Sequence, residues 1–224
     1  MELPLALPGL DRLMGLCQRL NLRLETLPPA REPPRAGSSL EGLPFDPVLA
    51  SVYARLGYAA FATELIGIGW ILDRSDDQVH ELEENNKRWR EKWWEELGEP
   101  VIVFGGDIYT YATVPGLADQ WGRQPVVEVN TQEFDGPHVL PVASNVDRFF
   151  DSYSRYLEAL VADSRYQESG EKELIFPWDA ADILARDEPL VELMRSGRFD
   201  SLMKNMKESN ATRRWFAKVT GHPE

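Results

Sequence analysis

The 224-residue chain has one cysteine and three histidines, so it is poor in the side chains that build metal centres and nucleophilic active sites. A single cysteine excludes an intrachain disulfide, and Cys17 lies in an apolar, helix-like stretch that favours a packed thiol over a nucleophile. None of His80, His138 and His222 is followed by a second ligand in a metal-binding motif; Glu84 follows His80 by four, but on a charged helix. We therefore expect no metal, no cofactor and no catalytic residue.

Basic residues are also scarce, with 24 Lys and Arg against 37 Asp and Glu and a formal net charge of −13. Such a surface repels nucleic acid and anionic membranes and attracts a basic protein. No run approaches the ~20 apolar residues that span a bilayer. The N-terminus has no basic region, and Pro4 and Pro8 break its apolar run, which does not fit a signal peptide. We expect a cytoplasmic protein that binds neither nucleic acid nor membrane.

Prolines mark the first boundary. Residues 9–25 carry leucines at helical spacing, and the paired prolines that follow predict a linker or long surface loop. Asp46 and Pro47 then predict the start of a helix that Gly57 ends. The predicted organisation is an N-terminal helix and Pro-rich linker at 1–40, an α+β domain at 41–165 and a helical C-terminal extension at 166–224.

The middle of the chain predicts a sheet. Val101 to Phe104 forms a short apolar strand, a Gly-Gly turn follows, and Ile108 to Val114 alternates like a second strand. Two more strands, at 126–130 and 138–142, have short connections that favour a meander. Ile66 to Leu72 predicts a further strand with a possible bulge.

Two helices are expected beside this sheet. Residues 73–99 are dense in charge, and Trp89 and Trp93 are i,i+4 neighbours that form a narrow aromatic stripe. The tryptophans either pack onto the sheet beneath a solvated face or help to meet a partner. The second helix opens at Ser144 or Asn145, and Asp147 suits the dipole of its first turn.

The stretch Val101-Ile-Val-Phe-Gly-Gly-Asp-Ile-Tyr-Thr-Tyr-Ala, with Pro125-Val-Val-Glu-Val-Asn and the helix from Ser144, resembles the SUKH superfamily of bacterial toxin-immunity proteins and a fungal cell-wall-synthesis regulator. The resemblance covers about residues 40–161 and includes Leu43-Pro and Gly57. It implies an α+β fold, with a mixed, largely antiparallel sheet backed by helices, and no shared catalytic set. The N-terminal extension and the helical tail depart from the family.

The resemblance implies a non-enzymatic binding protein. In the bacterial branch it would bind and neutralise a cognate polymorphic toxin, often a nuclease or deaminase, and an acidic surface would steer onto a basic toxin face. The predicted partner-binding residues are Trp70, Asp107, Tyr109, Tyr111, Trp121 and Glu133. Packing beneath a helix is the alternative for Tyr109 and Tyr111, and shaping the turn is the alternative for Asp107.

Two other classes of function stay open. The first is a regulatory scaffold or small-ligand-binding module, as in the fungal branch. The second is an enzyme of unrecognised type. A toxin gene next to this one would favour immunity, and turnover of a substrate would favour an enzyme.

Overall fold

The computed structural model describes residues 5–29, 32–62, 70–71, 82–106, 109–169, 174–206 and 209–221. The strands are β1 Leu24–Leu27, β2 Ser39–Leu40, β3 Leu43–Pro44, β4 Tyr58–Phe61, β5 Trp70–Ile71, β6 Ile102–Gly106, β7 Thr110–Thr113, β8 Val126–Asn130 and β9 His138–Ala143. The helices are α1 Pro8–Arg19, α2 Pro47–Arg55, α3 Leu82–Lys92, α4 Trp94–Leu97, α5 Val146–Ala162, α6 Ser164–Ser169, α7 Ala181–Leu184, α8 Glu188–Arg195 and α9 Asn210–Thr220. Short 3-10 turns lie at Pro115–Leu117 and Trp178–Ala180.

The main sheet has five strands in the order β5-β6-β7-β8-β9. Every neighbouring pair is antiparallel, which confirms the predicted meander and the α+β class. No parallel pair, which a mixed sheet needs, occurs within the described residues. Of the strand predicted at 66–72, only Trp70 and Ile71 are described, and they pair with Gly106 and Gly105 of β6.

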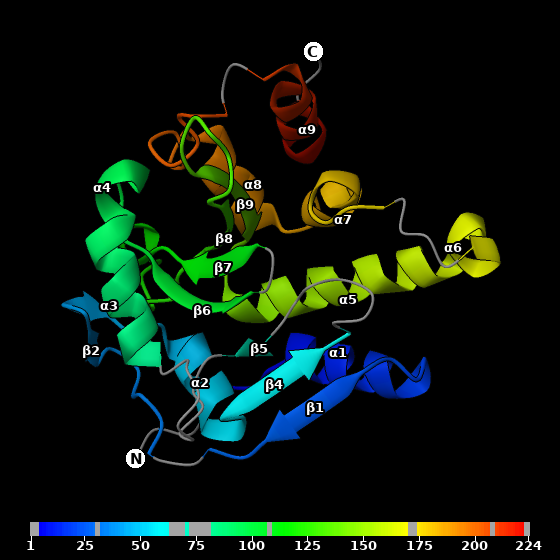
Figure 1. Cartoon of the computed structure of the whole chain (residues 1–224), viewed down its shortest axis with the longest axis horizontal. Coiled ribbons are helices and arrows are strands. Elements are labelled where there is room, and N and C mark those ends of the chain that lie inside the picture. Colours follow the sequence, from blue (N-terminus) through cyan, green and yellow to red (C-terminus); the bar gives the residue numbers. More distant parts are fainter. Residues whose placement is uncertain are drawn as a thin grey trace.

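Helix α5 crosses one face of this sheet, as Figure 1 shows. Asn145 caps it, because its side-chain oxygen accepts a hydrogen bond from the Arg148 N–H. The aromatic face of α5 is buried on the sheet, with the Phe149 ring 4.7 Å from that of Tyr111 and 6.0 Å from that of Phe104. The predicted aromatic face is thus the centre of the core.

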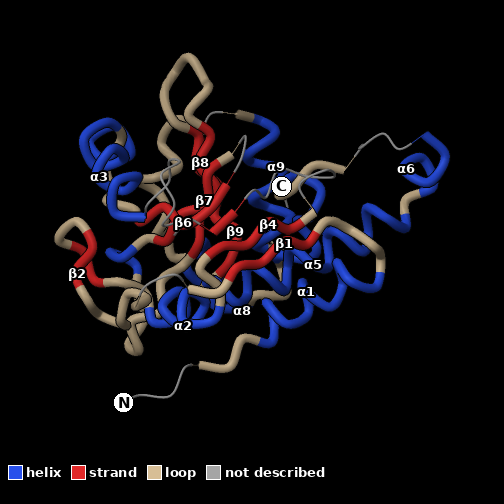
Figure 2. The backbone as a smooth tube through the Cα atoms, turned by 60° about the horizontal axis from the view of Figure 1, so that its bottom comes forward, coloured by secondary structure: helices blue, strands red, loops and turns tan. Residues whose placement is uncertain are grey.

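Both extensions pack onto this layer. Helix α1 lies beside α5 (Figures 1 and 2), and a Cβ added at Gly9 would stand 2.0 Å from the backbone oxygen of Asp147, so only glycine permits this approach. On the other side, Phe176 packs against the rings of both Tyr153 and Tyr156, with centroid distances of 5.2 Å and 5.4 Å. Buried side chains from α1, the sheet and α7–α9 form one hydrophobic core.

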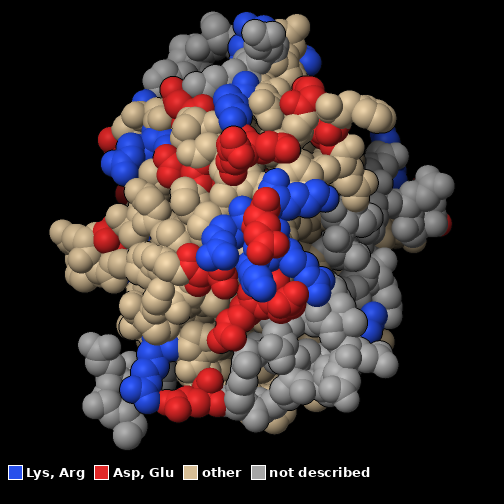
Figure 3. Space-filling model, turned by 60° about the vertical axis from the view of Figure 1, so that its left-hand side comes forward, with Lys and Arg blue, Asp and Glu red and all other residues tan. Residues whose placement is uncertain are grey.

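Helices α3 and α4 lie beside the part of β6 that β5 does not pair with. Buried Asn86 exchanges two hydrogen bonds with the backbone of Val103, and Trp94 donates to the Val101 carbonyl. The rings of Trp89 and Trp93 lie 6.2 Å apart. Trp89 is buried in the core and Trp93 packs against it, so the predicted aromatic stripe faces the protein. Acidic and basic side chains intermix on this side of the molecule (Figure 3). The remainder of the helix predicted from residue 73 lies outside the described residues.

The predicted start of α2 is confirmed, and a similar cap begins α9. Asp46 caps α2 and Ser209 caps α9 through their side chains. Gly57 follows α2 but does not adopt the left-handed conformation of a glycine cap. A Cβ at this position would stand 2.7 Å from the Pro28 carbonyl oxygen, so close backbone approach explains the glycine. No helix in the described part of the chain has the length and apolarity to cross a membrane.

Candidate functional site

The residues predicted to bind a partner lie at two opposite ends of the main sheet. Trp70 of β5 pairs with Gly106, the last residue of β6, and Tyr109 directly precedes β7, so both lie at the β6–β7 turn. Because Thr110 pairs with Val129, the β8–β9 loop that carries Glu133 lies at this same end. Trp121 lies at the other end, in the connection from β7 to β8. Asp107 and the side chain of Trp70 lie outside the described residues.

Tyr111 is a core residue and not a surface residue. Its side chain is 3% exposed, and its hydroxyl donates to a carboxyl oxygen of Glu128 at 3.1 Å beneath α5. The prediction that Tyr111 faces a partner is therefore wrong, because α5 covers its face of the strand. Tyr109, which precedes the strand, is half-buried.

Glu128 is a buried acid that the sequence pattern did not single out. It pairs directly with Tyr111 across β7 and β8, and burial raises its pKa from 4.5 to about 8, although the Tyr111 hydrogen bond opposes the shift. Its side chain is therefore mostly protonated at neutral pH. With a residue exposure of 5%, Glu128 offers no access to a substrate.

The tip of the β8–β9 loop carries the most exposed aromatic residue of the described chain. Phe134 is fully exposed, and exposed Glu133 and Asp135 flank it. The loop is held by hydrogen bonds from Asn130 to Glu133 at 2.9 Å and between His138 and Asp135 at 2.9 Å. We call Tyr109, Glu133, Phe134 and Asp135 the hairpin surface.

The same loop brings together a possible ligand set. Glu133, Asp135 and His138 each offer one ligand atom, and these atoms lie within 4.8 Å of one another. Carboxylate oxygen and imidazole nitrogen are ligands of zinc and other first-row metals. The two acids precede His138 by three and five positions in a loop, whereas the expected metal motifs place a second ligand after the histidine. The exposed hydrogen bond between His138 and Asp135 holds these two side chains together without a metal.

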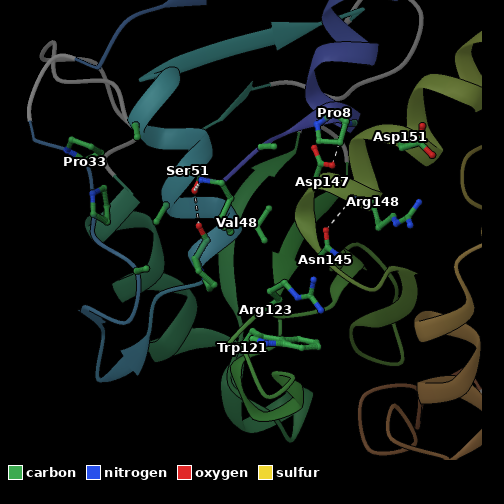
Figure 4. A pocket seen from close by; sticks show the side chains of 18 of the residues that line it. Pro8, Pro33, Val48, Ser51, Trp121, Arg123, Asn145, Asp147, Arg148 and Asp151 are labelled. Atoms are coloured by element: carbon green, nitrogen blue, oxygen red, sulfur yellow. Dashed lines mark hydrogen bonds between the residues drawn. The ribbon is translucent and has the colours of Figure 1, made fainter. Parts of the chain in front are cut away.

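A groove of about 1910 Å³ lies at the end of the sheet where Trp121 stands. Figure 4 shows it between α2, the first turns of α1 and α5, and the turn before β8. The Pro-rich segment forms another wall, since Pro33 and Pro34 line the groove. The charged lining residues are Arg12, Arg35, Arg123, Arg148, Arg155, Glu32, Asp147 and Asp151.

The turn that carries Trp121 is held in place by two carboxylates. Asp119 accepts hydrogen bonds from the Trp121 and Arg123 N–H groups and from the Arg123 guanidinium. Burial disfavours ionisation of Asp119, but these hydrogen bonds and the Arg123 charge outweigh it and lower its pKa. Asp46 accepts from the Gln124 N–H at 2.6 Å and so ties the turn to α2; burial raises the pKa of Asp46 to about 6.

Trp121 itself remains 65% exposed, as its loop position predicted. The Arg123 guanidinium stacks 4.5 Å from the centre of its ring. Trp121 therefore belongs to an arginine-lined groove and does not share a surface with Glu133.

Comparison with known proteins leaves the family open. No protein-family model matches the chain, and neither the curated proteins nor the solved structures contain a significant match. Membership of the SUKH superfamily stays a prediction from the residues.

Proposed function

We propose that this protein is a non-enzymatic protein-binding module that acts as an immunity protein, binding and neutralising a cognate toxin. The observation that carries the proposal is the fully exposed ring of Phe134 between two exposed carboxylates. A phenylalanine in water gains nothing from the fold, whereas its burial on a partner is worth about 1.5–3 kcal/mol. Aromatic anchors surrounded by polar groups are typical of protein interfaces.

The charge of this surface suits a basic partner. Glu133 and Asp135 lie beside the apolar anchor, and the whole chain carries a net charge of −13. Long-range attraction of this kind raises the rate of association with a basic protein. A toxin that acts on nucleic acid, such as a nuclease or deaminase, has a basic active face, and the SUKH resemblance points to the same class of partner.

The alternative is a regulatory scaffold or small-ligand-binding module. The groove is the feature that bears on it, but a volume of about 1910 Å³ exceeds the roughly 300–1,000 Å³ of small-molecule pockets. Protein binding is therefore the function that the geometry supports better.

The test begins with the tagged protein purified from its native cells and the partner identified by mass spectrometry. The affinity of the purified pair is then measured for Phe134→Ala, Glu133→Gln and the control Leu27→Ala, which truncates another exposed apolar side chain, on β1. We expect Phe134→Ala to weaken binding about tenfold or more, a loss of at least ~1.4 kcal/mol. Glu133→Gln should mainly slow association, and Leu27→Ala should bind normally.

Two results would count against the proposal. Wild-type affinity in both Phe134→Ala and Glu133→Gln would remove the hairpin surface as the interface. A set of signalling or cell-envelope proteins in place of one tight partner would favour the regulatory alternative.

A further inference from the structure

Arg148 occupies a position that helix stability does not explain. It lies in the first turn of α5, where the helix dipole disfavours a positive charge. Its side chain is exposed, and within the described residues its guanidinium makes no hydrogen bond or ion pair. It does act electrostatically on Asp147, but the Asp147 carboxylate already accepts the N–H groups of Gly9 and Leu10. A free cation at this position is therefore available to a ligand.

Arginines outnumber carboxylates in the lining of the groove although the protein is acidic. Five arginines and three carboxylates line it, whereas acidic residues outnumber basic ones over the whole chain. These carboxylates are engaged, Asp151 by Arg12 and Arg155 and Glu32 by Arg35. Arg12 also pairs with Glu158 and Arg123 with Asp119, so among the described residues Arg148 is the lining arginine that no carboxylate pairs with. A ligand that complements the unpaired Arg148 must bring a negative charge to this end of the groove.

Trp121 adds an apolar contact beside these arginines. In Figure 4, Trp121, Arg123 and Arg148 lie on one side of the groove, and Pro33 lies across from them. The Asp119 and Asp46 hydrogen bonds hold the Trp121 turn before any ligand arrives, so little conformational entropy remains to be lost on binding. Tryptophan and arginine are the residues most enriched among interface hot spots.

We propose that this groove binds an extended acidic segment of a partner protein. A carboxylate of the segment pairs with Arg148, and a neighbouring apolar side chain packs on Trp121 next to Arg123. The size and open shape of the groove suit an extended chain better than a small molecule. Nucleic acid binding needs several unpaired cations to displace counterions, and Arg148 alone does not supply them. The site lies away from the hairpin surface, so the proposal does not depend on the toxin partner.

The experiment uses a phage-displayed library of random ten-residue peptides, selected on the full-length protein. Arg148→Glu reverses the charge that the proposal relies on, and Arg214→Glu is the matched control on α9, at the far side of the molecule in Figure 1. Arg148→Glu puts an acidic side chain in the first turn of α5, which the dipole favours, so its melting temperature should not fall. A loss of binding in this variant therefore reports the site and not the fold.

We expect peptides recovered on the wild type and on Arg214→Glu to be enriched in Asp and Glu relative to the input. The recovered peptides should bind Arg148→Glu and Trp121→Ala at least about tenfold more weakly by fluorescence anisotropy. Recovery of peptides no more acidic than the input, or equal affinity for Arg148→Glu, would overturn the proposal. Tighter binding of a ten-nucleotide uridine RNA than of any recovered peptide would overturn it in favour of nucleic acid.

Discussion

Glu128 makes the stability of this protein depend on pH in a direction opposite to that of a salt-bridged acid. The pKa of its carboxyl rises from 4.5 in the unfolded chain to about 8 in the fold, because burial beneath α5 removes water from the charged form. The folded state thus holds the proton more tightly. This stabilisation is complete below pH 4.5 and is lost as the pH rises through about 8.

The magnitude follows from that interval. At about 1.4 kcal/mol for each pH unit, the range from 4.5 to about 8 corresponds to roughly 5 kcal/mol. Relaxation and water entry around an ionised buried group reduce such figures in proteins. We therefore expect ionisation of Glu128 to lower the free energy of unfolding of the wild type by at least about 2 kcal/mol as the pH rises from about 5 to about 9.

Glu128→Gln tests this reasoning. Glutamine has the same shape, keeps an oxygen that can accept the Tyr111 hydroxyl proton, and does not ionise. Urea unfolding at a series of pH values gives the free-energy difference between wild type and variant, and this difference cancels the titration of groups common to both, such as Asp46. The free energy of unfolding of Glu128→Gln should increase relative to that of the wild type as the pH rises.

The control is Glu133→Gln, which makes the same change on the exposed β8–β9 loop and should show no such trend. Any constant cost of the glutamine amide shifts the Glu128→Gln curve without changing its slope. A difference between wild type and Glu128→Gln that stays level from about pH 5 to pH 9 would refute a buried carboxyl with a raised pKa.

Two further predictions concern packing and buried hydrogen bonds. Gly9→Ala places a methyl group 2.0 Å from a carbonyl oxygen of α5 and should destabilise the protein by about 1–3 kcal/mol, whereas Gly15→Ala in the same helix meets only a guanidinium at 3.7 Å and should stabilise it by up to ~1 kcal/mol. Thermal melts check the pair, and shifts in the same direction would contradict the close contact of α1 with α5. Asn86→Ala leaves the buried N–H and carbonyl of Val103 without these partners and should cost roughly 3 kcal/mol in urea unfolding, whereas Asn85→Ala next to it should cost less than about 0.5 kcal/mol. Equal losses for the two asparagines would show that these bonds do not stabilise the contact between α3 and β6.

Several parts of the fold were predictable because their causes are local. A capping side chain bonds to an N–H two or three residues away, so Asp46 and Asn145 indicated where α2 and α5 begin. Short connections predicted the antiparallel meander for a similar reason. The predicted Gly-Gly turn was wrong in detail, because Gly105 and Gly106 are the last residues of β6 and pair with Tyr111 and Thr110. Helical spacing of aromatic residues likewise predicted the buried face of α5.

The candidate sites depended on contacts between distant parts of the chain. Alternation placed Tyr109 and Tyr111 on one face, but only the packing of α5 decided that Tyr111 is covered. Strand register placed Glu133 and Trp121 at opposite ends of the sheet, so one predicted surface became two. Register and packing are set by the whole core, and short-range sequence patterns do not contain them.

Asp147 has one role that is local in sequence and a second that depends on the tertiary structure. Its place in the sequence put it in the first turn of α5, where a negative charge suits the dipole of that helix. In the fold its carboxylate also accepts the Gly9 and Leu10 N–H groups at the start of α1, across 138 and 137 residues. The sequence by itself determined the local role, because a helix turn lies within a few residues. Only the tertiary structure decided the second role, because it depends on the close approach of two helices that only the packed core brings together.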